Sequence, residues 1–390
     1  MYPELQNEFL LKPGITFLNF GSFGACPKPV FEDYQNWQRL LEEEPVQFMT
    51  VKGLQYLEHS RKALGTFLNC QADDLVYVPN PTYAVNIIAK SLKLEAGDEV
   101  LSTDLEYGAC DRTWAYYCKS MGAVYKRQPV KLPIVSKEDF IADFLKGISN
   151  KTKVIFISQI TSSTALILPV KEIVDAARAR GILAIVDGAH VPGHMALDIQ
   201  DLDADIYTGA CHKWMMAPKG CTFLYVRREL QSRFDPLVIS WGYQSEKPSH
   251  SRFLDYHQMS GTRDFSAYLS VPASIEFMRK HNWPEVSARC KKMVLEQAPR
   301  FIELLNSPAL APLNQNFIGQ MLSLELKCQS PELIKDTLYQ EYQIEIPVMR
   351  HSEKVFIRYS LNAFNSSDDM DRLYTALSEL QTKGLILNEP

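Results

Sequence analysis

Gly209-Ala-Cys-His-Lys-Trp214 and, upstream of it, Val186-Asp-Gly-Ala-His190 are the two stretches that decide the expected fold. Each follows a short apolar run typical of a strand. Lys213 and Asp187, at the carboxyl ends of neighbouring strands of an open α/β sheet, would converge on one crevice. A lysine can hold an aldehyde as a Schiff base, and a carboxylate can keep a pyridine nitrogen protonated. The pair therefore predicts a pyridoxal 5'-phosphate site.

Strand-like and helix-like segments alternate through the middle of the chain. Strands are predicted at residues 74–78, 99–102, 153–158, 182–186, 206–208 and 221–226, with helices at 82–93, 110–121 and 170–180. Alternation of this kind predicts an α/β fold whose mainly parallel sheet carries helices on both faces.

The pattern changes after residue 271. Helices are predicted at about 273–281 and 285–305, at 331–342 and from residue 367, with strands at 321–326, 344–347 and 355–359. This order predicts a smaller C-terminal α+β domain. We expect residues 1–50 to join that domain and the active-site entrance, residues 51–270 to form the large cofactor-binding domain, and residues 271–390 to form the small domain.

Composition favours an ordinary globular protein with a small-molecule partner. The chain has 390 residues, a net charge of −5, 46% hydrophobic residues and 22% charged residues. The absence of Lys/Arg runs and of a long apolar run predicts no nucleic-acid partner and no membrane partner. Residues 1–8 lack the pattern of a signal peptide, so a cytoplasmic location is expected.

Cysteine and histidine spacing gives no sign of a metal site. The eight cysteines form no Cys-x-x-Cys motif and are expected to be reduced. His190 and His194 are four residues apart, but Pro192 and Gly193 disfavour the helix that would place both on one face.

A phosphate-binding turn is predicted at the start of the helix that follows the first strand. Asn80 suits the N-cap and Pro81 the first helical position, which would leave the amides of Thr82, Tyr83 and Ala84 pointing outward. Free amides and a threonine hydroxyl at a helix N-terminus suit a phosphate. By itself the same pattern is also that of a well-capped helix.

Four stretches, one of which extends the lysine stretch quoted above, carry a resemblance to a known family. These are Leu18-Asn-Phe-Gly-Ser-Phe-Gly24, Tyr207-Thr-Gly-Ala-Cys-His-Lys-Trp214, Ser260-Gly-Thr-Arg-Asp264 and Arg358-Tyr-Ser-Leu-Asn362. With the phosphate turn, they resemble the class V aminotransferase family of pyridoxal-phosphate enzymes (fold type I), and within it the isopenicillin N epimerase-like group. The likeness runs almost from end to end.

The resemblance implies roles around the cofactor ring. It makes Lys213 the Schiff-base lysine and Asp187 the partner of the pyridine nitrogen, with His190 near the phenolic oxygen. Tyr107 matches an aromatic residue that stacks on the ring. Ser162 matches a polar residue directed toward the ring and substrate, with Gln159 as the second choice.

It also implies the phosphate and substrate contacts. Thr82 and His212 would bind the phosphate, and Gly261 and Thr262 would reach the phosphate of a neighbouring subunit, which predicts a homodimer with shared active sites. Arg358 would bind the substrate carboxylate. The remaining substrate contacts are expected from Asn19, Ser22 and Phe23.

The sequence departs from the family at two of these places. Ala210 stands where many relatives carry a Ser or Thr phosphate ligand, so Thr208 or a backbone amide is expected to replace it. Ser162 stands where many relatives carry asparagine.

Imine formation needs a lysine amine that is partly neutral, so the pKa of Lys213 is expected to be lowered by a cation such as His212 or by a desolvated pocket. The same amine is the natural base at Cα, and Tyr107 would fix the tilt of the ring. An epimerase would need a second acid–base group, for which Tyr107 and the loop at residues 19–23 are candidates.

Several reactions remain open on the sequence alone. They are epimerisation, β-elimination of a cysteine conjugate or sulfoxide, and transamination; a non-catalytic pyridoxal-phosphate protein is the alternative outside enzymes. Persulfide chemistry is disfavoured because residues 347–352, before the carboxylate arginine, contain no cysteine.

Overall fold

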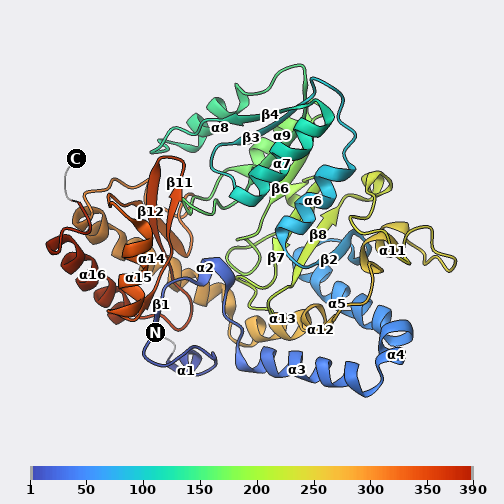
Figure 1. The fold of residues 1–390 in the computed structure, drawn as a ribbon, viewed down its shortest axis with the longest axis horizontal. Coiled ribbons are helices and arrows are strands. Elements are labelled where there is room, and N and C mark those ends of the chain that lie inside the picture. Colours follow the sequence, from blue (N-terminus) through green and yellow to red (C-terminus); the bar gives the residue numbers. More distant parts are fainter. Residues whose placement is uncertain (1–2, 388–390) are drawn as a thin grey trace.

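The computed structural model describes residues 3–387, and a seven-stranded sheet forms its centre (Figure 1). The strand order is β2 (Leu75–Val78), β8 (Thr222–Val226), β7 (Ile206–Ala210), β6 (Leu183–Asp187), β5 (Thr152–Ser158), β3 (Glu99–Thr103) and β4 (Val124–Gln128). β8 is antiparallel to both of its neighbours, β2 and β7, and all other neighbouring pairs in this sheet are parallel. The prediction of a mainly parallel sheet is confirmed.

Both faces of this sheet are buried by helices. On β5, Val154 and Phe156 pack with α6 (Pro81–Ser91) and α7 (Gly108–Met121), whereas Ile155 and Ile157 belong to the core on the other face. That second core includes α5 (Gly53–Leu68), α8 (Lys137–Leu145) and α9 (Val170–Arg178). Side chains alternate between the faces of a strand, so a continuous apolar run is what a strand covered on both sides requires.

The C-terminal part is a smaller α+β unit, as predicted. Its three-stranded antiparallel sheet has the order β11 (Val348–His351), β12 (Lys354–Ser360), β9 (Met321–Glu325). Its helices are α13 (Val271–Lys280), α14 (Trp283–Leu304), α15 (Pro331–Gln340) and α16 (Ser367–Thr382). The single strand expected at residues 344–347 is instead β10 (Ile344–Glu345) followed by the start of β11.

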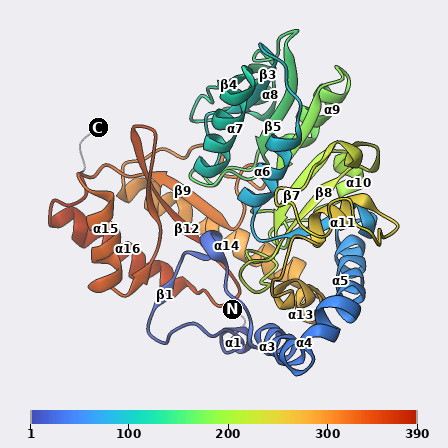
Figure 2. The same ribbon diagram turned by 45° about the vertical axis from the view of Figure 1, so that its right-hand side comes forward.

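The N-terminal segment connects the two parts. After α1 (Pro3–Gln6), β1 (Thr16–Phe17) pairs in parallel with β10. Next, α2 (Phe20–Phe23) lies between the central sheet and the C-terminal part. The chain then forms α3 (Lys28–Glu43) and α4 (Pro45–Gln47), and Figures 1 and 2 both show α3 running beside α13. The domain boundaries at residues 50 and 270 stay predictions.

The remaining α-helices are short: α10 (Ile199–Leu202), α11 (Arg252–Gln258) and α12 (Ser266–Leu269). A π-helix, η1 (Phe48–Lys52), and two 3-10 helices, η2 (Ala72–Asp74) and η3 (Arg228–Arg233), complete the described elements. Across the described residues, no helix combines the length and the apolar character needed to cross a membrane. All eight cysteines are unpaired, as expected.

Candidate active site

The predicted lysine and aspartate follow adjacent parallel strands at one edge of the sheet. Asp187 ends β6 and pairs in register with Thr208 of β7, and Lys213 follows β7. The Nζ atom of Lys213 lies 3.2 Å from Nε2 of His190, which follows β6. The carboxyl ends of neighbouring parallel strands thus bring these three side chains into one cluster.

Asp187 is a buried carboxylate bound only by neutral donors. Its side chain is 3% exposed and accepts hydrogen bonds from the Ala189 N–H at 2.9 Å and the Cys110 thiol at 3.7 Å. Burial raises the pKa of Asp187, while these hydrogen bonds and the charge of Lys213 oppose the rise. A buried carboxylate of this kind suits a cationic partner such as a protonated ring nitrogen.

Burial lowers the pKa of Lys213 to about 8, and the nearby charge of Arg358 adds to this effect. Burial also lowers the pKa of His212, to about 4, so His212 is neutral at pH 7 and is not the cation that acts on Lys213. Both expected causes are found: the desolvated pocket is the larger one, and the cation that adds to it is Arg358 in place of His212. Lys213 therefore has a substantial neutral fraction near neutral pH, as imine formation requires.

Trp214, which the sequence did not single out, sets the tautomer of His190. The indole Nε1–H donates to His190 Nδ1 at 3.4 Å. Because an indole can only donate, Nδ1 must be the acceptor, and we assign the imidazole proton to Nε2, which faces Lys213. Burial lowers the pKa of His190 far below its usual value, so the ring stays neutral. His190 thus presents one N–H donor to the site.

Arg358 on β12 is a buried guanidinium that contacts no carboxylate. It is 1% exposed, and it donates to the Ser162 carbonyl at 2.5 Å and to Ser22 Oγ at 3.2 Å. Its Nε has no partner among the described atoms. Burial lowers the pKa of Arg358 to about 10. A buried arginine with an unsatisfied N–H is costly by itself, so this arrangement suits an anionic ligand.

The N-terminal segment reaches the cluster at α2. Ser22 Oγ donates to Asn19 Oδ1 at 2.5 Å and accepts from Arg358, so Asn19 and Ser22 hold one side of the guanidinium. Gly24 has φ +65°, and a Cβ there would lie 2.5 Å from the carbonyl oxygens of His212 and Lys213. Glycine is therefore required where this segment crosses the lysine loop. Phe23 is largely exposed beside it.

The phosphate turn forms, with fewer free amides than expected. Asn80 Oδ1 accepts from the Tyr83 N–H at 2.8 Å, and the Ala84 N–H donates to the Asn80 carbonyl at 3.3 Å. The prediction that these two amides point outward is therefore wrong, because the N-cap residue satisfies them. Thr82 keeps its place in the first turn of α6.

The ligand that replaces a hydroxyl at Ala210 is not Thr208. The Thr208 hydroxyl is buried and donates to the Phe223 carbonyl of β8 at 2.9 Å, inside the sheet. His212 Nδ1 lies 2.8 Å from the Cys221 carbonyl and must donate to it, which leaves the ring's Nε2 for another partner.

Tyr107 is partly exposed, whereas Gln159 and Ser162 in the loop after β5 have hydrogen-bond partners within the protein. The Tyr107 side chain is 50% exposed at the start of α7, so it is not an ordinary buried tyrosine. Ser162 contributes its carbonyl to Arg358, whereas Gln159 Oε1 accepts from the Tyr207 hydroxyl at 2.8 Å. Gln159 is thus committed to a partner inside the sheet.

Glu106 is a second group that the sequence did not single out. It is buried and accepts hydrogen bonds from the Ser158 hydroxyl at 2.5 Å, the Ser158 N–H at 3.1 Å and the Thr103 hydroxyl at 2.7 Å. Burial raises the pKa of Glu106 to about 7, despite these hydrogen bonds, and the charge of Asp187 adds to the rise. Its position directly before Tyr107, in the segment that follows β3, was the available signal.

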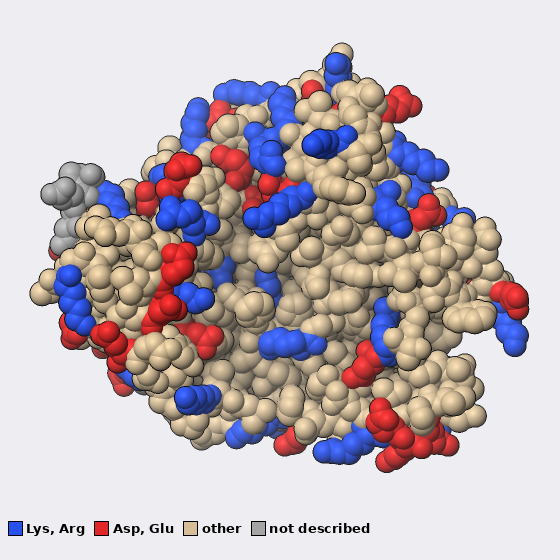
Figure 3. All heavy atoms as spheres, in the orientation of Figure 1, with Lys and Arg blue, Asp and Glu red and all other residues tan. Residues whose placement is uncertain are grey.

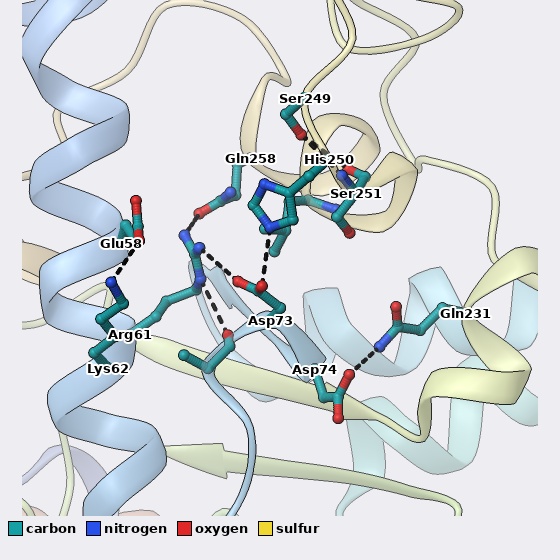
Figure 4. A network of polar contacts seen from close by, with 12 residues as sticks. Glu58, Arg61, Lys62, Asp73, Asp74, Gln231, Ser249, His250, Ser251 and Gln258 are labelled. Carbon is teal, nitrogen blue, oxygen red and sulfur yellow. Dashed lines mark hydrogen bonds and ion pairs between the residues drawn. The ribbon is translucent and has the colours of Figure 1, made fainter.

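Gly261 and Thr262 lie apart from this buried cluster. Both are exposed on the loop between α11 and α12, and Gly261 has φ +105°. A polar network fixes the start of this segment (Figure 4): Arg61 of α5 donates to Gln258 at 2.5 Å and to Asp73 at 3.3 Å, and His250 contacts Asp73 at 2.9 Å.

The residues present fit pyridoxal phosphate and an amino acid. Asp187 offers a carboxylate to a ring nitrogen, Lys213 offers an amine to an aldehyde, and Arg358 has an unsatisfied donor for a carboxylate. The face drawn in Figure 3 is hollowed between the central sheet and the C-terminal part, with Lys or Arg atoms visible inside the hollow.

Comparisons with known proteins identify the family. The family model "Aminotransferase class-V" matches residues 27–373. The chain is 30% identical over 393 residues to an isopenicillin N epimerase of Amycolatopsis lactamdurans, covering 97% of this chain and 98% of that protein. It is 27% identical over 413 residues to a putative L-cysteine desulfhydrase 1 of Oryza sativa subsp. japonica, covering 95% and 84%.

Solved structures share the fold. The apo cysteine desulfurase from Thermococcus onnurineus NA1 superposes with a TM-score of 0.84 at 19% identity, covering 99% of each chain. The cystine C–S lyase C-DES in complex with cysteine persulfide gives a TM-score of 0.82 at 21% identity, covering 94% of this chain and 98% of that chain. The chain therefore belongs to the class V aminotransferase family of pyridoxal-phosphate-dependent enzymes.

Proposed function

We propose that this enzyme removes the Cα proton of an amino-acid substrate, with epimerisation at Cα as the outcome. The observation that carries the proposal is Arg358, a buried guanidinium with an unsatisfied Nε and no carboxylate partner, whose charge acts on Lys213. A substrate α-carboxylate has the shape and charge that a guanidinium binds best. The full-length likeness to isopenicillin N epimerases supports the outcome.

In this proposal several side chains hold the cofactor. Asp187 would accept a hydrogen bond from the ring nitrogen, and His190 would donate its Nε2–H to the phenolic oxygen. Tyr107 and Ser162 would supply the further contacts to the ring. Thr82 and His212 would bind the phosphate, whereas the Tyr83 amide, which donates to Asn80, would not. Bound pyridoxal phosphate supplies an electron sink that stabilises negative charge at Cα.

Different side chains bind the substrate carboxylate and transfer the Cα proton. Arg358, held by the Ser162 carbonyl and Ser22, fixes the carboxylate and so orients Cα. The Lys213 amine, whose pKa is about 8, accepts the Cα proton. Epimerisation also needs a donor on the opposite side, and we assign this role to Tyr107. Asn19 and Phe23 border the substrate on the α2 side.

Carbon–sulfur β-elimination is the second candidate. Lys213, whose pKa burial lowers to about 8, can act as the base for this reaction as well. One base and a leaving group are sufficient for elimination, and named L-cysteine desulfhydrases are among the relatives.

Incubation of the loaded enzyme in deuterated water separates these reactions. An L-amino-acid substrate that gains deuterium at Cα and inverts supports epimerisation, and Tyr107→Phe should then retain exchange but lose inversion. Pyruvate and free thiol from an L-cysteine conjugate would instead show a lyase. Absence of Cα exchange and of elimination with every substrate tried would overturn both candidates.

We also propose a homodimer in which Gly261 and Thr262 complete the phosphate site of the partner. Both residues are exposed, and the preceding segment exposes Ile239 and Trp241, the latter at 82%. Exposed apolar side chains near a functional site are typical of an interface.

Mixing two defective variants tests the shared site. Thr262→Ala and Lys213→Ala should each retain little cofactor. In their heterodimer, one site combines an intact Lys213 with an intact Thr262 of the partner, while the other carries both defects. Recovery of cofactor retention on mixing is expected; no recovery, or a monomer at working concentration, would contradict the proposal.

A further inference from the structure

A second cavity lies outside the cofactor site. It has a volume of about 640 Å³ and is bordered by α5, the loop at residues 193–197, α13 and α14. Its lining is mainly apolar and includes Phe67, Met195, Leu197, Ile275, Met278 and Trp283. A volume of this order is typical of a small-molecule site.

This cavity is separated from the catalytic cluster by a buried aromatic wall. His194 borders the cavity, and its ring packs against Trp214 with centroids 4.1 Å apart. Trp214 in turn contacts His190 of the cluster. The His194 ring is fixed by Nδ1 contacting the His190 carbonyl at 3.0 Å and by Nε2 accepting from the Gln320 N–H at 2.6 Å. None of Asp187, His190, Lys213 or Arg358 lines the cavity.

The lining carries one cation without an acidic partner. Lys291 of α14 is half-buried at the cavity, and burial lowers its pKa with no carboxylate acting against the shift. The other basic side chain, Arg279, contacts both oxygens of Glu276, at 2.6 and 2.7 Å. No Asp or Glu lines the cavity, so the ammonium group of an amino acid would find no counter-charge there.

We propose that this cavity binds a small amphiphile with a single carboxylate and an apolar body, such as a medium-chain fatty acid. The apolar side chains would take the hydrocarbon portion, and Lys291 would pair with the carboxylate. Charge complementarity selects this ligand over a zwitterionic substrate or a cation. The site would be distinct from the one that binds the amino acid.

Calorimetric titration of the pyridoxal-phosphate-loaded enzyme with octanoate and with octylammonium tests the proposal. The two probes have the same chain length and opposite charge. Octanoate should bind at one site per chain and at least about tenfold more tightly than octylammonium. The absence of saturable octanoate binding, or equal binding of both probes, would overturn the proposal without need of any variant.

Variants of α14 locate the contact. Lys291→Met should weaken octanoate binding about tenfold or more, and Lys291→Glu should reverse the preference toward octylammonium. Lys292→Met is the matched control, because Lys292 is exposed, pairs with Glu296 at 3.6 Å and does not line the cavity. Octanoate affinity that is unchanged in folded Lys291→Met, or lost equally in Lys292→Met, would contradict the assigned site.

Discussion

Two buried arginines of this protein have opposite surroundings. Arg61 of α5 is 2% exposed and binds Asp73, Gln258 and the Ala72 carbonyl, so its charge and its donors are matched within the chain (Figure 4). Arg358 is 1% exposed, contacts only a carbonyl and a hydroxyl, and keeps an unsatisfied Nε.

The carboxylates of the same two regions differ in the same way. Asp73 contacts Arg61 and His250, whereas Asp187 is bound by an amide and a thiol. Because an uncompensated buried charge is costly, its presence points to a ligand that supplies the missing partner. We therefore interpret the network around Arg61 as structural and the cluster around Arg358 as the ligand-binding site that we propose.

The largest difference is expected between Asp187→Asn and Asp73→Asn. Asparagine at position 187 cannot hold a positive ring nitrogen, so kcat should fall on the order of 10³-fold, while the free energy of unfolding changes little. Asparagine at position 73 leaves Arg61 without a counter-charge and should lower the free energy of unfolding by about 1–3 kcal/mol. Steady-state kinetics and urea titration measure kcat and the free energy of unfolding of both variants. Equal losses of kcat in the two variants would contradict the contrast between the two regions.

A similar contrast is expected between Arg358→Met and Arg61→Met. The first should reduce kcat/KM by about 10²-fold through lost carboxylate binding, and removal of an unpaired buried charge should leave the protein at least as stable. The second should be destabilising with kcat retained. If the Arg358→Met protein has a lower urea midpoint of unfolding than the Arg61→Met protein, the distinction between the two arginines is wrong.

Glu106→Gln should change how stability depends on pH. The pKa of Glu106 is raised from 4.5 to about 7, so between these values the folded protein holds a proton that the unfolded chain has released. The free energy of unfolding should therefore fall as pH rises through this window, by on the order of 1–3 kcal/mol. Urea titrations at several pH values should show a smaller decline in Glu106→Gln. Glu99→Gln, at the start of β3, is the control that should keep the decline.

The smallest expected effect is a shift in the pH profile of cofactor capture. Apo protein should capture pyridoxal phosphate faster as pH rises through about 8, where the Lys213 amine becomes neutral. Arg358 helps to lower the pKa of Lys213, so Arg358→Met should move the midpoint upward by less than about one unit. Arg279→Met, which changes an exposed arginine of α13, should leave the midpoint in place; a downward shift in Arg358→Met would contradict the electrostatic role.

Much of the central sheet could be predicted because strands buried on both faces have continuous apolar sequences. The edge strand β4, Val124–Gln128, was missed because its polar residues Lys126, Arg127 and Gln128 interrupt the apolar run that marks the central strands. The antiparallel direction of β8 had a usable signal: residues 211–221 between β7 and β8 are too short for a helical crossover.

For the site, sequence order and family likeness selected residues that the fold brings together, among them Asp187, His190, Lys213 and Arg358. Contacts between residues that are far apart in the sequence could not be predicted from it. The Trp214 indole reaches His190 across 24 positions, and Arg358 reaches Ser162 across 196. The amides of Tyr83 and Ala84 were misjudged because the same N-cap that favours the helix also satisfies them.

Borohydride reduction of the loaded enzyme, followed by peptide mapping, tests the central claim most directly. The central claim is that the buried cluster around Lys213 binds pyridoxal phosphate and that the Lys213 amine forms the Schiff base with it. The cofactor should be fixed on the peptide that contains Lys213, with Lys219 and Lys291 unlabelled in the same digest. Label on another lysine, or a protein that cannot be labelled after reconstitution, would contradict the claim.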